Sequence, residues 1–241
     1  MARRQKIRNA AILLSFLLFP ITLNYFSPYL IIDAAAQGIV AGSFLTFSAL
    51  FLSSLFLGRA FCGWVCPGAG IQEACFAIND KKVRRRSDRI KWMLWVPWIG
   101  GIALAAVLAG GLRAVNPLYM TETGTSVAEP ANYFVYFSIV ALFVILSFAV
   151  GKRALCHCVC WMAPFMIIGT KIKNALRLPS LGLKAAPEKC KKCGACDKNC
   201  PMSLDVSKMV EANRMKNGEC ILCGSCIDNC PANAIKYSWK P

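Results

Sequence analysis

The sequence predicts an α-helical membrane protein with four transmembrane helices and both termini on the cytoplasmic side, followed by a small cysteine-rich C-terminal domain. Apolar residues make up 56% of the 241 residues and the mean hydropathy is +0.48, which argues against an ordinary soluble enzyme. The apolar residues gather in long runs and the basic residues in alternate loops, while eight of the 14 cysteines lie within residues 187–241. That number of cysteines in a chain of this length favours metal or iron–sulfur ligation over a disulfide scaffold.

Four segments satisfy the rule that a spanning helix needs about 20 mostly apolar residues. They are roughly 10–26, which could continue toward residue 32, then 38–58, 92–112 and 133–150. Pro20 and Pro97 each lack a backbone donor, so we expect a bend or a helix start at each. The first segment could instead be a signal peptide, because basic residues precede it and Ala34 to Ala36 offer a cleavage site, but its apolar run is long for one.

Basic residues predict the orientation, because loops rich in Lys and Arg stay on the cytoplasmic side. The N-terminal segment carries four, and the loop after the second span carries Arg59, Lys81, Lys82, Arg84, Arg85, Arg86, Arg89 and Lys91. The connection 27–37 has none, and 113–132 has only Arg113, beside Glu122 and Glu129. We therefore expect an integral protein of the cytoplasmic membrane with its C-terminal domain in the cytoplasm. The +16 charge then reports topology and lipid contact, not nucleic-acid binding.

The C-terminal cysteines form two copies of the pattern C-x2-C-x2-C-x3-C-P. The first copy contains Cys190, Cys193, Cys196 and Cys200, and the second contains Cys220, Cys223, Cys226 and Cys230. Three cysteines at this spacing wrap one cluster, and the fourth ligates the cluster of the other run. We expect one [4Fe-4S] cluster on Cys190, Cys193, Cys196 and Cys230, and a second on Cys220, Cys223, Cys226 and Cys200. Two zinc sites with four thiolates each are the less favoured alternative.

This C-terminal stretch resembles a bacterial two-cluster ferredoxin, an α+β domain, over residues 187–241. Residues 178–186 contain Pro and Gly and are predicted to be a linker. Residues 1–177 then form the membrane domain.

An internal repeat lies at the ends of the second and fourth spans. Residues 59–66 and 153–160 both read R-A-apolar-C-x3-C, 94 positions apart. Cysteines four apart on a helix project from one face, so two such pairs can bring together the four thiols of Cys62, Cys66, Cys156 and Cys160. We expect a redox-active or metal-ligating cofactor site there, with core packing as the alternative. The apolar segments 67–78 and 161–170 that follow are too short to span and predict interfacial or re-entrant pieces.

The remaining chemically interesting side chains give weaker predictions. Cys75 and Cys158 have no counterpart in the repeat and fit core packing, with a part in the site as the alternative. His157 is interpreted as a proton carrier or an interfacial side chain, and Trp64 as one of several tryptophans of an interfacial aromatic belt.

The whole combination resembles the membrane-bound ferredoxin-type quinol dehydrogenase family of periplasmic nitrate reductase systems. Nitrous-oxide-reductase accessory proteins and the methylamine-utilisation ferredoxin protein are similar. The motif from Gly58 to Gly68 matches this group closely, whereas Trp161 follows Cys160 where the family often has proline.

The resemblance implies a membrane electron carrier and not a stand-alone enzyme. Such a carrier could serve as a subunit of a quinol dehydrogenase-type oxidoreductase. Electrons would pass between the quinone pool and the two cytoplasmic clusters, with the four membrane cysteines as a relay, and would feed or drain an unidentified partner redox protein. No catalytic acid–base pair and no nucleotide loop stand out. The alternative is a redox maturation or assembly factor that supplies electrons to a metal site in a partner enzyme.

Overall fold

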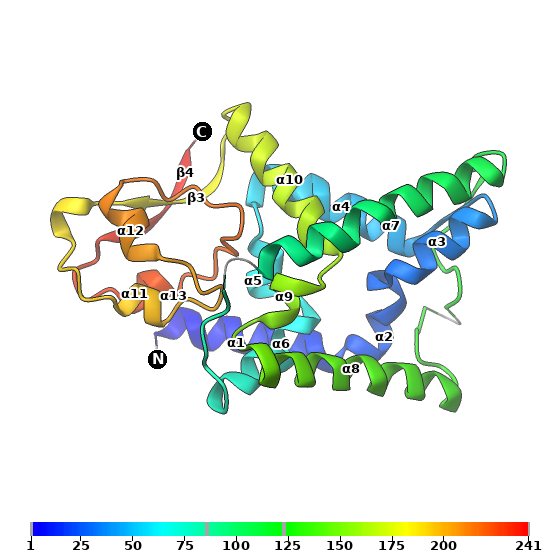
Figure 1. Cartoon of the computed structure of the whole chain (residues 1–241), viewed down its shortest axis with the longest axis horizontal. Coiled ribbons are helices and arrows are strands. Elements are labelled where there is room, and N and C mark those ends of the chain that lie inside the picture. Colours follow the sequence, from blue (N-terminus) through cyan, green and yellow to red (C-terminus); the bar gives the residue numbers. More distant parts are fainter. Residues whose placement is uncertain (1, 85–86, 122–123, 241) are drawn as a thin grey trace.

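The structure, a computed structural model, describes residues 2–84, 87–121 and 124–240. The chain is mostly helical (Figure 1). The cysteine-rich C-terminal region lies at one end, and long helices extend away from it. The short helices α5 (Ala60–Trp64), α6 (Pro67–Ala74) and α9 (Ala154–Cys158) lie between these two parts.

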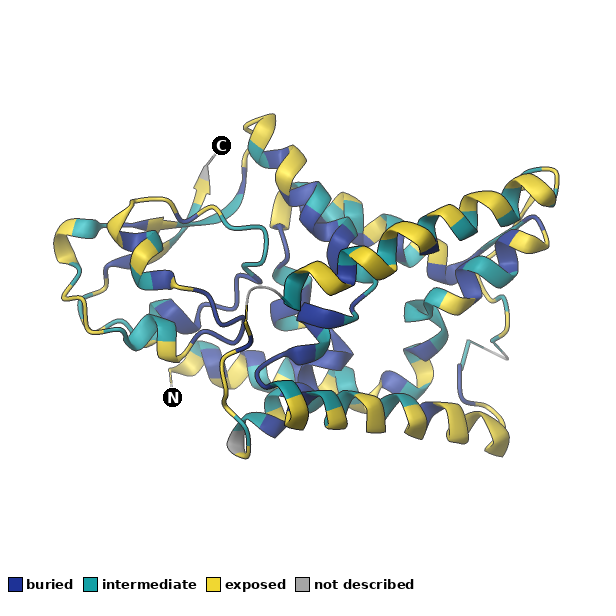
Figure 2. Cartoon of the chain, in the orientation of Figure 1, coloured by how far each residue is buried: buried dark blue, intermediate teal, exposed yellow. Residues whose placement is uncertain are grey.

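Two helices are long and apolar enough to cross a membrane, α7 (Asp88–Leu108) and α8 (Pro130–Val150). Both are exposed along much of their length (Figure 2), as expected for helices that face lipid. The sequence predicts the end of this span at residue 112. Helix α7 ends earlier, at Leu108, because Gly110 and Gly111 adopt positive φ angles. Pro97 does not begin the helix but lies inside it.

The first predicted span is a bent pair of helical segments. Helix α1 (Arg3–Leu17) is followed by α2 (Phe19–Thr22) and the 3-10 turn η1 (Leu23–Phe26), with a bend of 57° at the break. Pro20 lies directly after this break, which agrees with the predicted bend. The next helix, α3 (Pro28–Ala36), begins after Ser27, whose hydroxyl accepts a hydrogen bond from the N–H of Leu30.

The second predicted span is shorter in the structure than the sequence predicts. Residues 39–41 form strand β1 (Ile39–Ala41), which pairs in parallel with β2 (Ala114–Asn116), so helix α4 covers only Gly42–Leu57. Within the described residues, two helices have membrane length, or three if the bent pair counts as one span. The prediction of four spans is therefore supported in part.

The internal repeat has a structural counterpart. Helices α4 and α8 both end at a glycine with positive φ, Gly58 and Gly151, and a five-residue helix follows each. The chain then turns in the same way, because the N–H of Cys66 donates to Phe61 O at 3.0 Å and that of Cys160 to Leu155 O at 2.9 Å. In the first copy α6 and the turn η2 (Cys75–Ala77) come next.

In the second copy the following helix is longer than an interfacial piece. Helix α10 (Met162–Ala175) extends past the predicted segment and packs along α4. Gly169 allows this packing, since a Cβ there would lie 1.8 Å from Ser54 Oγ.

The C-terminal region combines one small sheet with short helices. Strand β3 (Ser180–Ala185) pairs antiparallel with β4 (Ile235–Lys240). Between them lie the turn η4 (Pro187–Lys189) and the helices α11 (Ala195–Lys198), α12 (Val206–Glu211) and α13 (Ser225–Asp228). The stretch predicted as a linker thus contains the first strand of the ferredoxin-like sheet.

Three features gather at one end of the molecule: the start of α1, the basic loop before α7 and the ferredoxin-like region. Gln5 donates to Cys223 O at 3.1 Å, and the N–H of Val83 donates to Ser203 Oγ at 3.1 Å. Arg85 and Arg86 of the basic loop lie outside the described residues, as does Glu122. A single hydrophobic core extends from Leu50 and Met166 in the membrane part to Ile235 in the ferredoxin-like region.

Candidate iron–sulfur sites

The two ferredoxin-type runs have the same backbone shape. Lys192 and Gly194 in the first run have positive φ, and so do Leu222 and Gly224 in the second. Left-handed residues of this kind turn successive N–H groups toward one side, and such concavities favour anions, including iron–sulfur clusters. The loops therefore suit an anionic group enclosed by thiolates.

The cysteines of the two runs line two small cavities. One is lined by Cys200, Cys220, Cys223 and Cys226, and we name it the proximal site because it faces the membrane part. The other is lined by Cys190, Cys193, Cys196 and Cys230, and we name it the distal site. Each site takes its fourth cysteine from the other run. These are the two sets that the sequence predicts as ligands, and their occupancy by clusters stays a prediction.

Cys62, Cys66, Cys156 and Cys160 form a third group, which we name the four-thiol site. All four side chains are buried. Cys66, Cys156 and Cys160 line one cavity, and Cys62 shares a hydrophobic core with Cys156. The structure thus brings together the four thiols that the repeat predicts. It differs from the predicted helical face, because each short helix ends between its two cysteines. Cys66 has ψ of 123° before Pro67, and a residue before proline avoids the helical region.

The second copy of the motif lacks that proline, and Trp161 takes its place. The backbone nevertheless makes the same turn at Cys160 as at Cys66, so the missing proline does not change this turn relative to the first copy. Within the described ranges, no three His, Cys, Asp or Glu side chains converge on a position suited to a single metal ion. Four thiolates, here as in the two ferredoxin-type sets, are instead the donors that a [4Fe-4S] cluster takes.

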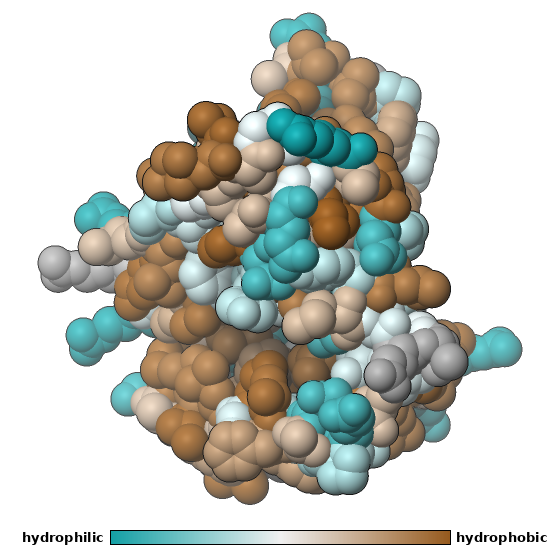
Figure 3. All heavy atoms as spheres, turned by 90° about the vertical axis from the view of Figure 1, so that its right-hand side faces the viewer, coloured by the Kyte–Doolittle hydropathy of each residue, from teal (hydrophilic) through white to brown (hydrophobic). Residues whose placement is uncertain are grey.

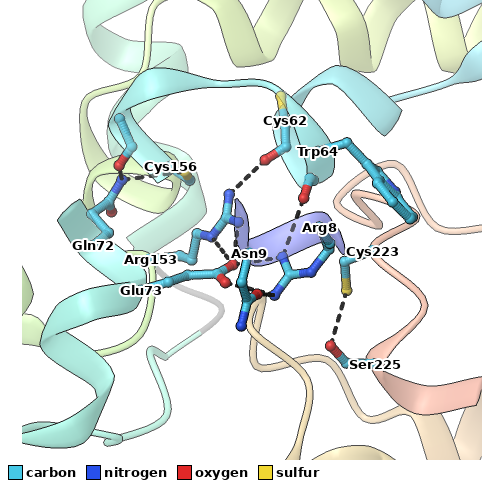
Figure 4. A network of polar contacts seen from close by, with 12 residues as sticks. Arg8, Asn9, Cys62, Trp64, Gln72, Glu73, Arg153, Cys156, Cys223 and Ser225 are labelled. Atoms are coloured by element: carbon cyan, nitrogen blue, oxygen red, sulfur yellow. Dashed lines mark hydrogen bonds and ion pairs between the residues drawn. The ribbon is translucent and has the colours of Figure 1, made fainter. Parts of the chain in front are cut away.

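A buried charge network lies beneath the four-thiol site (Figure 4). Glu73 of α6 accepts hydrogen bonds from Arg8 of α1 at 2.6 and 2.9 Å, and from Arg153. The Nη1 of Arg153 also donates to Cys62 O at 2.6 Å, and Arg8 donates to Gly63 O at 3.1 Å. Burial raises the pKa of Glu73, but the charges of Arg153 and Arg8 outweigh it and hold that pKa below its usual value. The network ties α1, α6 and both repeat copies together.

A second set of contacts fixes the proximal site against the membrane part. Arg59 donates to Glu219 Oε2 at 2.6 Å, and Lys91 contacts both oxygens of the same carboxylate at 2.7 Å. The Trp64 N–H donates to Leu222 O at 3.0 Å. Gly63 lies against the same loop, since a Cβ there would come within 2.3 Å of Ile221 O. Backbone of the proximal loop therefore packs directly on α5.

Sequence reasoning missed several of these residues. Trp64 holds the ferredoxin-like loop and was expected in an interfacial belt. Glu73 and Glu219 were not singled out, although Glu73 is the only charged residue in the apolar segment 67–78, which could have signalled a buried partner. The arginines were visible at the first position of the repeat, but their partners lie far away in the sequence.

The unmatched cysteines and the histidine face other elements. Cys75 lies beside Ser147 of α8, and Cys158 lies beside Ser87 and Asp88 at the start of α7. The Nδ1 of His157 is 2.6 Å from Asp88 Oδ1, and its side chain is 2% exposed. His157 is therefore a buried side chain with a carboxylate partner.

An apolar cavity of about 420 Å³ adjoins the four-thiol site. Cys66, Cys156 and Cys160 line one wall, and α8 contributes apolar side chains, among them Leu142. Asn24, Ser27 and Gln72 add polar groups; the remaining lining residues include Phe19, Leu23, Phe26, Ile139, Phe143 and Trp161. Leu142 is 45% exposed on the outer surface of α8, so the cavity lies next to the surface that would face lipid.

Comparisons with known proteins agree with the iron–sulfur interpretation. A family model described as a 4Fe-4S binding domain matches residues 40–86, and one described as a 4Fe-4S dicluster domain matches residues 183–231. The first match covers Cys62 and Cys66, and the second covers both ferredoxin-type runs. No solved structure matches the chain.

Several curated proteins are related to the chain over most of its length. The methylamine utilization ferredoxin-type protein MauN of Methylorubrum extorquens is 26% identical over 72% of this chain and 59% of its own. YccM of Escherichia coli, whose name assigns it to electron transport, is 22% identical over 80% of this chain and 55% of its own. An uncharacterized protein of Methanocaldococcus jannaschii is 24% identical over 77% of this chain and 74% of its own.

The chain thus spans little more than half the length of the first two relatives. These matches support ferredoxin-type 4Fe-4S binding regions in a chain with membrane-length helices, which agrees with the predicted iron–sulfur and membrane character.

Proposed function

We propose that this protein passes electrons between quinones in the membrane and a partner redox protein in the cytoplasm. The observation that carries the proposal is the serial order of four sites. The apolar cavity adjoins the four-thiol site through Cys66, Cys156 and Cys160. Cys62 of that site shares a hydrophobic core with Cys200, Cys223 and Cys226 of the proximal site. The distal site follows, because the two ferredoxin-type runs exchange their fourth cysteines.

The cavity has the chemistry that a quinone ring needs. Its walls are mostly apolar, as is usual for small-molecule sites, with a few polar groups that can orient a ligand. The Ser27 hydroxyl accepts from the N–H of Leu30 and keeps its own proton to donate to a quinone oxygen. Conversion of a quinol to a quinone releases two electrons and two protons. Iron–sulfur clusters bound at the three sites would supply one-electron carriers.

The side of the membrane follows from charge. The start of α1, the basic loop before α7 and the ferredoxin-like region lie together, and the first two carry half of the 18 Lys and Arg residues in 1–177. The positive-inside rule then favours the cytoplasm for this end, in a protein of the cytoplasmic membrane. Resemblance of the motif from Gly58 to Gly68 further supports a role like that of quinol dehydrogenase subunits in nitrate reductase systems.

Quinol-driven reduction of the full-length protein tests the proposal. The protein is purified without oxygen, and a short-chain quinol such as menadiol is added while loss of iron–sulfur absorbance is followed. Leu142→Trp should fill part of the cavity and slow this reduction at least tenfold, whereas reduction by dithionite should be unchanged. Ile145→Trp is the matched control, because Ile145 is exposed on α8 and lies outside the cavity lining.

Replacement of the relay gives the second arm. Cys62→Ser with Cys156→Ser should leave the ferredoxin-type signals reducible by dithionite and abolish their reduction by quinol. Wild-type protein that fails to react with quinol contradicts the proposal and favours the assembly-factor alternative. Equal slowing by Leu142→Trp and Ile145→Trp contradicts the assignment of the cavity.

A further inference from the structure

The two arginines that begin the repeat copies have different partners. Both side chains are wholly buried. Arg153 uses all three of its nitrogens, Nε and Nη2 on Glu73 and Nη1 on Cys62 O. Arg59 uses only Nη1, on Glu219 and on Gly218 O at 3.3 Å. Its Nε and Nη2 are buried and have no hydrogen-bond partner in the part of the chain that the structure describes.

Buried donors of this kind are rare in folded proteins. Native structures leave few buried polar groups unpaired, and an unpaired N–H on a charged group is the more costly case. Arg59 is therefore expected to have a stronger acceptor than the polypeptide supplies, because the Cys62 thiol beside its side chain is only a weak one. Its surroundings indicate where that acceptor lies, because the guanidinium interacts electrostatically with Cys62, Cys156 and Cys160. These thiols belong to both repeat copies.

We infer that Arg59 is a positioning residue for an anionic iron–sulfur cluster at the four-thiol site, with Nε and Nη2 as donors to sulfur. The inference rests on the proposed cluster relay, but not on quinone as the substrate. A guanidinium has five N–H groups in a fixed fork, so one face can bind Glu219 while the other faces the thiolates. Hydrogen bonds and positive charge near sulfur raise the reduction potential of such a cluster.

Arg59 also connects the four-thiol site with the proximal site. Glu219 directly precedes Cys220, which lines the proximal site. One side chain therefore contacts the surroundings of both sites, the four-thiol site through its free donors and the proximal loop through Nη1. Arg153 has no such position, because its contacts are with Glu73 of α6 and the backbone at Cys62.

The test measures the midpoint potential of the third iron–sulfur signal by electron paramagnetic resonance in the full-length protein. Arg59→Gln should shift that potential to more negative values. We expect at least a tenfold change in the ratio of reduced to oxidised cluster at a fixed solution potential, about 59 mV for a one-electron couple. Arg59→Lys keeps the charge and the Glu219 pair but loses the fork of donors, so it should shift the potential in the same direction by less.

Lys91→Gln is the matched control. Lys91 binds the same Glu219 carboxylate and is equally buried, but its ammonium group is occupied by Glu219 and Asp88. Its replacement should leave the third signal unchanged. An equal shift in Lys91→Gln and Arg59→Gln would show that Arg59 acts only through Glu219 and would overturn the inference.

Iron content separates the remaining outcomes. Loss of about four of twelve irons in Arg59→Gln, with both ferredoxin-type signals kept, would support the positioning role, each cluster holding four irons. If Arg59→Gln binds no iron at all, Arg59→Lys decides, and an unshifted third signal there overturns the inference. Wild-type protein with only about eight irons and no third signal overturns both the relay and this inference, whereas an unshifted third signal overturns the inference alone.

Discussion

The proximal and distal sites are built from the same cysteine pattern but lie in different surroundings. Cys200, Cys223 and Cys226 of the proximal site are buried, whereas Cys193 of the distal site is exposed and the other distal cysteines are half-buried. The proximal loop packs against Gly63, Trp64 and Arg59, whereas the distal loop carries the exposed side chains of Lys191 and Lys192. Membrane elements thus enclose one site and leave the other open to solvent.

This difference shows how a repeated motif acquires two different surroundings. The ligand pattern and the loop backbone are common to both runs, so they do not distinguish the two sites. Packing distinguishes them, because the contacts of Arg59, Gly63 and Trp64 reach the proximal loop. The distal site touches the membrane part less directly, through Lys152, which donates to Lys198 O at 2.9 Å.

Replacement of Glu73 should lower the stability of the protein more than any other substitution proposed below. Glu73→Gln leaves Arg8 and Arg153 buried without their carboxylate, and loss of one partner from a buried ion pair costs about 3–5 kcal/mol. We expect a large fall in thermal stability in detergent, measured by tryptophan fluorescence. Glu211→Gln is the control, because Glu211 pairs with Lys192 at 3.8 Å on the exposed surface and should change stability by less than about 1 kcal/mol. Equal effects would contradict the role given to the network.

Gly63→Ala should disturb the proximal site alone. The added Cβ would collide with Ile221 O, and overpacking of a tight core contact costs about 1–3 kcal/mol. We expect the proximal signal in electron paramagnetic resonance to broaden or shift while the distal signal keeps its shape. Gly182→Ala serves as the control, since a Cβ there would lie 3.9 Å from Ser238 O, an ordinary van der Waals contact. A change of the distal signal in Gly63→Ala would count against separate surroundings.

Trp64→Phe should have a smaller effect in the same place. It removes the donor to Leu222 O, but the Tyr237 hydroxyl still donates to that oxygen at 2.7 Å. Loss of one such hydrogen bond costs about 0.5–1.5 kcal/mol. A modest shift of the proximal midpoint potential is expected in a redox titration. Trp239→Phe, at an exposed position on β4, should leave both potentials where they are.

Charge reversal at the distal loop should give the smallest effect, one of rate alone. Lys191→Glu with Lys192→Glu changes the sign of an exposed surface, and surface charge alters encounter rates at low ionic strength. Oxidation of the reduced protein by ferricyanide, an anion, should slow about threefold to tenfold at low salt, and the difference should vanish at high salt. A salt-independent change would mean that the substitutions act on the site itself and not on encounter.

The sequence predicted the elements whose signals are local. The cysteine runs, the apolar segments of α7 and α8, the bend near Pro20 and the repeat at Arg59 and Arg153 were all visible in patterns of fewer than about 25 residues. The shortening of α4 was not predicted. It results from strand β1, which forms only by pairing with β2, more than 70 positions away in the sequence.

The parts of the site that escaped prediction depend on distant partners. Nothing near Glu73 in the sequence indicates Arg153, and nothing near Glu219 indicates Arg59 or Lys91. The helical-face argument for the cysteines also failed locally, because the short helices end at Trp64 and Cys158, before the second cysteine of each pair. Convergence of the four thiols depended instead on the repeat as a whole.

The hydrogen bond between Gln5 and Asp228 joins residues 223 positions apart, and it sets an order of events during synthesis. At about 5–20 residues per second, roughly ten to fifty seconds separate translation of these two residues. During that time Gln5 and Arg4 have no partners on α13, and the loop that carries Cys223 does not yet exist. The end of the membrane part that contacts the ferredoxin-like region therefore stays open until the second cysteine run has been made, which would leave an interval for insertion of the predicted clusters before α1 packs against that run.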